Sequence, residues 1–155
     1  MDNVISISFN DEPPGCIPIT EVNEFILSVL NNLECKNWDI SILFCNDDFI
    51  RELNKQYRKI DLPTDVLSFE QAETYIAENG TERFNAGDIV ISIDSLKFNS
   101  NEFQVSLNEE LKRLLIHGIL HLKGMDHADN SPEQEMLQFQ EKLLQQYTAT
   151  IIYRE

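Results

Sequence analysis

The sequence predicts an α/β fold of the α+β type, in which a single small mixed β-sheet of about four strands packs against helices. The length of 155 residues predicts one domain over residues 1–155, with a core that needs no disulfide or structural metal to fold. Short segments alternate apolar and polar residues, as half-buried strands do. Longer segments repeat apolar residues at helical spacing, so strands and helices are mixed along the chain.

The first half of the chain predicts strand, helix, strand and helix in that order. Residues 5–9 and 38–45 have the pattern of strands. Between them, Thr20 is expected to cap a helix with an apolar stripe. Asn46 is expected to cap the next helix, which should end before Pro63.

The second half predicts two further strands, at residues 65–69 and 88–93, with the polar and acidic residues 70–85 forming a solvated loop between them. Ser106 and Glu109 form a capping-box pattern that opens a helix running to about residue 123. Gly124 is suited to end that helix in a left-handed conformation. Residues 131–134, with a proline at the second position, are expected to open the last helix.

Acidic residues dominate the charge, with 27 Asp+Glu against 12 Lys+Arg and a formal net charge of −15. This charge excludes a uniformly basic nucleic-acid-binding domain. No apolar run approaches the roughly 20 residues of a membrane span, and the N-terminus lacks the basic region of a secretory signal. The three cysteines form no C-x-x-C pair, which favours a reducing compartment. We therefore expect a cytoplasmic protein without a membrane partner.

The three histidines of the chain all lie within residues 117–127. His117 and His121 are four residues apart on a predicted central helix, so their imidazoles lie on one face within reach of a single metal ion. A turn at Gly124 brings His127 toward the same point. Three nitrogen ligands leave a tetrahedral metal one open position for water, which is typical of catalytic zinc and lowers the pKa of that water.

The spacing H-x-x-x-H-x-x-G-x-x-H matches the zinc-binding pattern of metzincin proteases. Those enzymes place a glutamate directly after the first histidine as the general base, and this chain has Gly118 there. The metal geometry survives this difference, but a peptidase mechanism lacks its proton acceptor.

Lys55, Arg58 and Lys59 share one face of the helix that precedes Pro63. The guanidinium of Arg58 presents a fork of donors suited to phosphate or carboxylate oxygens. A solvated charged face is the alternative interpretation. Arg113, one helical turn before His117, is a further candidate for local positive charge.

Three motifs together resemble the YbeY family of endoribonucleases. They are Leu53-Asn54-x-x-Tyr57-Arg58 followed by residues 63–69, Gly87-Asp88-Ile89, and His117-Gly118-x-Leu120-His121-Leu122-x-Gly124-x-Asp126-His127. The resemblance implies a small α/β sandwich and a zinc-dependent endoribonuclease that prefers single-stranded RNA. It further implies action in ribosomal RNA maturation, at the 3′ end of the small-subunit rRNA, and in ribosome quality control.

By the same resemblance, His117, His121 and His127 would ligate one Zn²⁺, and Arg58 would be the catalytic arginine of the cleft. We expect Lys55 and Lys59 to assist substrate binding. The expected partners are single-stranded rRNA and the ribosome or its associated proteins, and no DNA is expected. The acidity predicts weak intrinsic RNA affinity, so a partner would have to deliver the substrate.

The group that handles the proton stays open, with Asp65, Asp88 and Asp126 as candidates. Two alternative functions also stay open. One is a ribosome-assembly binding factor with a mainly structural metal, and the other is a metal hydrolase that is not a nuclease.

Overall fold

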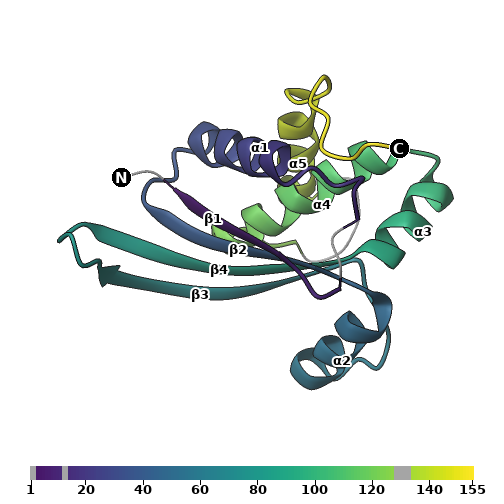
Figure 1. Ribbon diagram of the computed structural model, residues 1–155, viewed down its shortest axis with the longest axis horizontal. Helices are drawn as coiled ribbons and strands as arrows, with labels where there is room; N and C mark the ends of the chain where they lie inside the picture. The colour runs from purple at the N-terminus through teal and green to yellow at the C-terminus, as the bar shows by residue number, and fades with distance from the viewer. Residues whose placement is uncertain (1–2, 12–13, 128–133) are drawn as a thin grey trace.

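The computed structural model describes residues 3–11, 14–127 and 134–155, in which four strands form one mixed sheet (Figure 1). They are β1 (Val4–Phe9), β2 (Trp38–Cys45), β3 (Val66–Ile76) and β4 (Glu82–Ser92), in the spatial order β1-β2-β4-β3. β1 is parallel to β2 and β2 is parallel to β4, whereas β3 pairs with β4 in the antiparallel direction. The predicted α+β fold with a small mixed sheet is confirmed.

Five helices accompany the sheet in the described part of the chain: α1 (Ile19–Asn32), α2 (Asp47–Arg58), α3 (Ile93–Phe103), α4 (Leu107–Leu122) and α5 (Glu135–Gln145). None of the helices there is long and apolar enough to cross a membrane. Figure 1 shows α2 on the opposite side of the sheet from α1 and α4. The sheet is therefore the middle layer between a large helical layer and a single helix.

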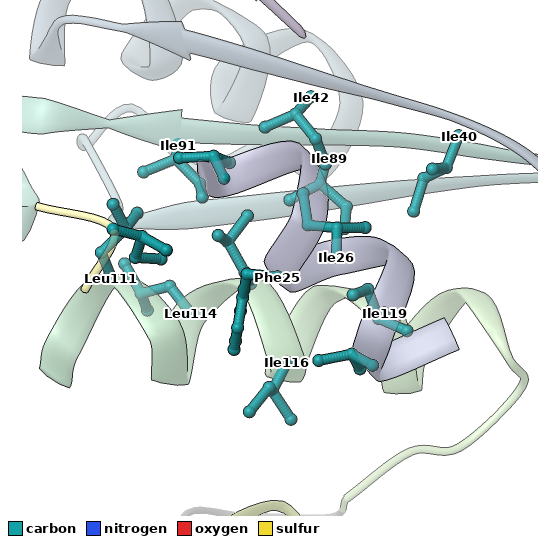
Figure 2. Packing of buried hydrophobic residues seen from close by; sticks show 14 of the residues in the cluster. Phe25, Ile26, Ile40, Ile42, Ile89, Ile91, Leu111, Leu114, Ile116 and Ile119 are labelled. Carbon is teal, nitrogen blue, oxygen red and sulfur yellow. The ribbon is translucent and has the colours of Figure 1, made fainter. Parts of the chain in front are cut away.

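Side chains of alternate strand residues fill the two layers. The larger core joins the sheet to α1 and α4, and Figure 2 shows its central members, Ile40, Ile42, Ile89 and Ile91 of the strands with Phe25, Ile26, Leu111, Leu114, Ile116 and Ile119 of the helices. The smaller core, on the α2 side, contains Cys45, Ile50, Leu67 and Val90. Successive residues of β4 thus point to opposite layers, which is the period-two pattern of a sheet buried on both faces.

The helix caps are partly as predicted. Asn46 accepts a hydrogen bond from the Phe49 amide at 2.9 Å, and Ser106 accepts one from the Glu109 amide at 3.0 Å, as expected for N-caps. Thr20 does not cap α1, because the helix begins at Ile19 after Pro18. Residues 131–133 of the segment expected to open the last helix lie outside the described residues, and α5 begins at Glu135.

The predicted loop at residues 70–85 is wrong, since β3 runs to Ile76 and β4 starts at Glu82. The outer part of this hairpin is exposed along β3, so burial imposes no apolar alternation on its sequence. The pairing shifts between Glu70 and Glu73, opposite Gly87. Gly87 has φ +134° and a Cβ atom there would collide with the carbonyl oxygen of Phe69, so this position of the hairpin requires glycine.

The helix α3 was not predicted. The strand expected at residues 88–93 ends at Ser92, whose side chain accepts a hydrogen bond from the Ser95 amide at 3.3 Å and so caps α3. Only Leu96 and Ser100 of this helix are buried, while Phe98 and Phe103 are exposed. The apolar residues of α3 therefore do not form the buried stripe that identifies a helix in a sequence.

Candidate metal centre

The three histidines form one cluster at the C-terminal end of α4. Nitrogen atoms of His117, His121 and His127 all lie within 4.8 Å of one another, and each side chain is half-buried. The Nε2 atoms of His117 and His121 are 3.0 Å apart. The ring centroid of His127 lies 5.1 Å from that of His117 and 5.4 Å from that of His121. The predicted convergence of the three imidazoles is confirmed.

The turn that brings His127 back depends on the end of α4. Gly124 has φ +98°, its amide donates to the carbonyl of His121 at 2.9 Å, and the Met125 amide donates to the carbonyl of Leu120 at 3.0 Å. These two bonds form a Schellman motif, in which a left-handed residue reverses the chain after the helix. The predicted role of Gly124 as the helix stop is confirmed.

Burial favours the neutral form of His117 and His121. Desolvation lowers the pKa of His117 and of His121 below the ordinary histidine value, and the neighbouring imidazoles lower them further. Neutral imidazoles are the form that binds metals. Three nitrogen donors with a fourth position left to solvent suit zinc and also other borderline transition metals. The cluster can therefore hold a metal ion.

A cleft of about 760 Å³ opens in front of the histidines. Its walls come from the end of α2, the start of β3, and the turn after α4. Arg58 lies on the α2 wall and is exposed, so the structure brings it into the same cleft as the three histidines. Lys55 of α2 and Lys59 are exposed but do not line this cleft. The expectation that Lys59 shares the helix face of Lys55 and Arg58 is wrong, because α2 ends at Arg58 and Lys59 is its left-handed C-cap, with φ +62°.

Of the three aspartates that were candidates to handle the proton, two lie at the cleft and one does not. Asp65 and Asp126 line the cleft. Asp65 Oδ2 accepts a hydrogen bond from the side-chain amide of Asn99 at 2.9 Å, so the unpredicted helix α3 helps to hold it. Asp88 lies on the α2 side of the sheet, where it accepts a hydrogen bond from Ser41. The expectation that Asp88 could serve the metal site is therefore wrong.

Arg113 does not supply free positive charge to the cleft. Its guanidinium donates to Glu110 at 2.9 Å and to Glu109 at 3.2 Å on its own helix. It also forms two bonds to Glu141 of α5, both at 3.0 Å. Three carboxylates offset this cation, so the expectation that Arg113 adds to the positive charge near His117 is wrong.

Sequence reasoning missed Gln140 of α5, which touches the metal cluster. Its Oε1 lies 2.7 Å from Nδ1 of His117, and its side chain is only 6% exposed. The sequence does contain a sign of it, because Gln140 lies four residues after Met136 and four before Leu144 on the buried face of α5. A polar residue inside an apolar stripe requires a buried hydrogen-bond partner.

The chain has close relatives with a shared description. A family model described as Endoribonuclease YbeY matches residues 16–148. The Endoribonuclease YbeY of Treponema denticola is 68% identical over 154 residues, covering 99% of each chain. That of Treponema pallidum (strain Nichols) is 55% identical over 133 residues, covering 86% of this chain and 83% of the relative.

The fold is also found among solved structures. The solution structure of a Thermotoga maritima protein is similar, with a TM-score of 0.63 and 28% sequence identity, covering 92% of this chain and 87% of that one. The family model and the relatives span most of the chain, including the three histidines of α4 and the turn after it. The chain therefore belongs to the YbeY endoribonuclease family.

Proposed function

We propose that this protein is a zinc-dependent endoribonuclease that cleaves single-stranded RNA. The observation that carries the proposal is the placement of Arg58 in the same cleft as His117, His121 and His127. The relatives described as Endoribonuclease YbeY support the reaction class. The three-nitrogen donor set supports zinc among the available metals.

Each side chain of the cleft has a chemical task in this proposal. His117, His121 and His127 hold the metal, which when bound supplies Lewis acidity and a water of lowered pKa. Arg58 binds the scissile phosphate through its guanidinium fork and stabilises the charge that develops on the phosphate oxygens. Asp65, Glu70 and Asp126 line the cleft, and their carboxylates are available to accept a proton.

Lys55 and Lys59 have a secondary task. Both are exposed, Lys55 in the last turn of α2 and Lys59 at the C-cap, directly after Arg58. Because they lie outside the cleft, we assign them to phosphates of the RNA that flank the cleaved bond. Their removal should weaken substrate binding and leave the chemical step intact.

The biological substrate that we propose is ribosomal RNA, cleaved in the cytoplasm during maturation of the 3′ end of the small-subunit rRNA and during ribosome quality control. The net charge of −15 supports delivery by the ribosome or its associated proteins, since an acidic protein repels free RNA.

A cleavage assay tests the proposal. Metal-replete protein and its His121→Ala variant are incubated with a labelled single-stranded rRNA fragment and with the same fragment annealed to its complement. We expect cleavage of the single strand by the parent protein alone, and its loss on chelation. Equal cleavage by both proteins would overturn the proposal.

The cleavage assay, together with thermal melting and a ribosome-binding measurement, distinguishes this proposal from the alternative of a ribosome-assembly factor with a structural metal. That alternative predicts no cleavage by the parent protein, a large fall in melting temperature on chelation, and retained ribosome binding. The peptidase form of the other alternative is disfavoured because Gly118 stands directly after His117, where metzincin proteases have their general base.

A further inference from the structure

A chain of hydrogen bonds runs behind the histidine cluster from Arg113 to His117. It passes through two side chains of α5, Glu141 and Gln140, neither of which lines the cleft. The two ends of the chain lie on α4, four residues apart, so α5 closes a loop of polar contacts against α4. Each link restricts the next one, and together they determine the state of His117.

The first link fixes Glu141 as a carboxylate. Arg113 Nε donates to Glu141 Oε2 and Arg113 Nη2 donates to Oε1, both at 3.0 Å, in a bidentate ion pair. Burial alone would raise the pKa of Glu141, but the hydrogen bonds from Arg113 and Gln140 hold it below the ordinary value. An ionised carboxylate only accepts hydrogen bonds.

The second link fixes the orientation of the Gln140 amide. Glu141 Oε2 lies 3.1 Å from the amide and can only accept, so the NH₂ group of Gln140 must face it. The carbonyl oxygen Oε1 then faces the other way and lies 2.7 Å from Nδ1 of His117. A flipped amide would place an oxygen against the Glu141 carboxylate and an NH₂ group against the imidazole.

The third link fixes the tautomer of His117. The carbonyl oxygen of Gln140 has lone pairs only, so Nδ1 of His117 must carry the proton. Nε2 of the neutral ring then presents its lone pair, and this atom faces Nε2 of His121 at 3.0 Å. The free lone pair thus points to the place where the three histidines converge.

We infer that Gln140 and Glu141 are positioning residues, which hold His117 as the Nδ1–H tautomer and aim its Nε2 at the metal. This inference rests on the metal site of the proposed function, but it does not depend on which reaction the metal performs. Gln140 acts directly on His117, and Glu141 acts through Gln140. In metal sites, an acceptor on the second ring nitrogen also raises the basicity of the ligand.

The direct test observes the tautomer in the metal-free protein. Long-range ¹H–¹⁵N NMR spectra distinguish the two neutral tautomers of a histidine ring. At pH 8 we expect His117 of the parent protein in the Nδ1–H form. A His117 ring found in the Nε2–H form, or in an even mixture, would overturn the inference without any variant being made.

Metal affinity supplies the second readout. Gln140→Met removes the acceptor while keeping a side chain of similar length, and we expect metal affinity, measured by competition with a chelator, to fall about 10- to 100-fold. Gln140→Glu keeps an acceptor for Nδ1–H but loses the NH₂ group that faces Glu141, so it should recover part of that loss. Gln145→Ala is the matched control, since Gln145 is exposed on the same helix.

The outcomes separate positioning from packing. A purely structural role for Gln140 predicts equal metal affinities for Gln140→Met and Gln140→Glu after both are shown to be folded by circular dichroism. That result would overturn the inference, as would an affinity of Gln140→Met within twofold of the control. Neither readout uses RNA, so a failure here is distinguishable from a failure of the proposed nuclease activity.

Discussion

Gly118 of α4 lies so close to Ile89 of β4 that a Cβ atom at Gly118 would be 2.7 Å from Cδ1 of Ile89. This close contact between α4 and the sheet lies directly beside His117, the first histidine of the metal cluster. The glycine that replaces the general base of the metzincin pattern is therefore required for packing.

Substitution of this glycine should destabilise the fold. Gly118→Val forces two methyl groups against the fully buried Ile89, and overpacking of this kind costs about 3 kcal/mol of unfolding free energy. Urea denaturation followed by circular dichroism measures the loss. Gly15→Val is the matched control, because a Cβ atom at Gly15 would meet nothing within 4 Å. Equal midpoints for the two variants would contradict the packing argument.

Removal of Arg58 should reduce the rate of RNA cleavage while leaving the metal in place. Loss of one charged donor to a transition-state oxyanion typically costs about 10²- to 10³-fold in kcat, and we expect Arg58→Ala to fall in this range. Arg58→Lys should recover only part of the activity, since an ammonium lacks the planar fork. Arg51→Ala, on the same helix and paired with Asp61, is the control. An unchanged kcat for Arg58→Ala would remove Arg58 from the mechanism.

The metal-free protein should lose stability as the pH falls. Burial lowers the pKa of His117 and His121 in the folded state, so between the folded and unfolded values the unfolded chain binds more protons. The free energy of unfolding therefore decreases as the pH drops through and below the ordinary histidine value of about 6.5. Thermal melting in the presence of a chelator, at steps from pH 7.5 to pH 5, measures this trend.

The control for this trend is a variant that lacks both titrating groups. His117→Gln combined with His121→Gln should flatten the decrease over the same pH range. A parent protein whose melting temperature is constant, or rises, as the pH falls from 7 to 5 would show that these histidines do not titrate as described.

The thiol of Cys45 should be unreactive in the folded protein. Burial raises its pKa to about 12, and the nearby Asp47, Asp94 and Asp11 add to the effect. Because the thiolate is the reactive form, a thiol reagent at pH 8 should modify Cys45 only after denaturation. Peptide mapping of the labelled protein checks this. Rapid modification of Cys45 in the native state would contradict the assigned burial.

Local patterns in the sequence were sufficient for most of the fold. The caps Asn46 and Ser106 and the stop at Gly124 depend on hydrogen bonds within one turn, so their residue types predict them. The outer hairpin and α3 could not be found in the same way. Most side chains of outer β3 and of α3 face solvent, so these elements are defined mainly by the pairing of β3 with β4 and by the cap at Ser92.

The residues of the site also differ in whether local sequence or tertiary packing places them. His117, His121 and His127 converge because of helix spacing and one turn, both of which are local. Gln140 reaches His117 from another helix, and Asp88 points away from it because of strand alternation. Such relationships depend on how separate helices and strands pack together, and the spacing of residues within a motif does not predict that packing.

Metal analysis of the purified protein tests the central claim most directly. Bound metal is measured by mass spectrometry after dialysis for the parent protein, for His117→Ala, and for Arg58→Ala as the control that lines the cleft without being a ligand. We predict about one equivalent of zinc in the parent protein and in Arg58→Ala, and its loss in His117→Ala. Undiminished metal in His117→Ala, or none in the parent protein after zinc is supplied, would contradict the claim that these histidines hold the catalytic metal.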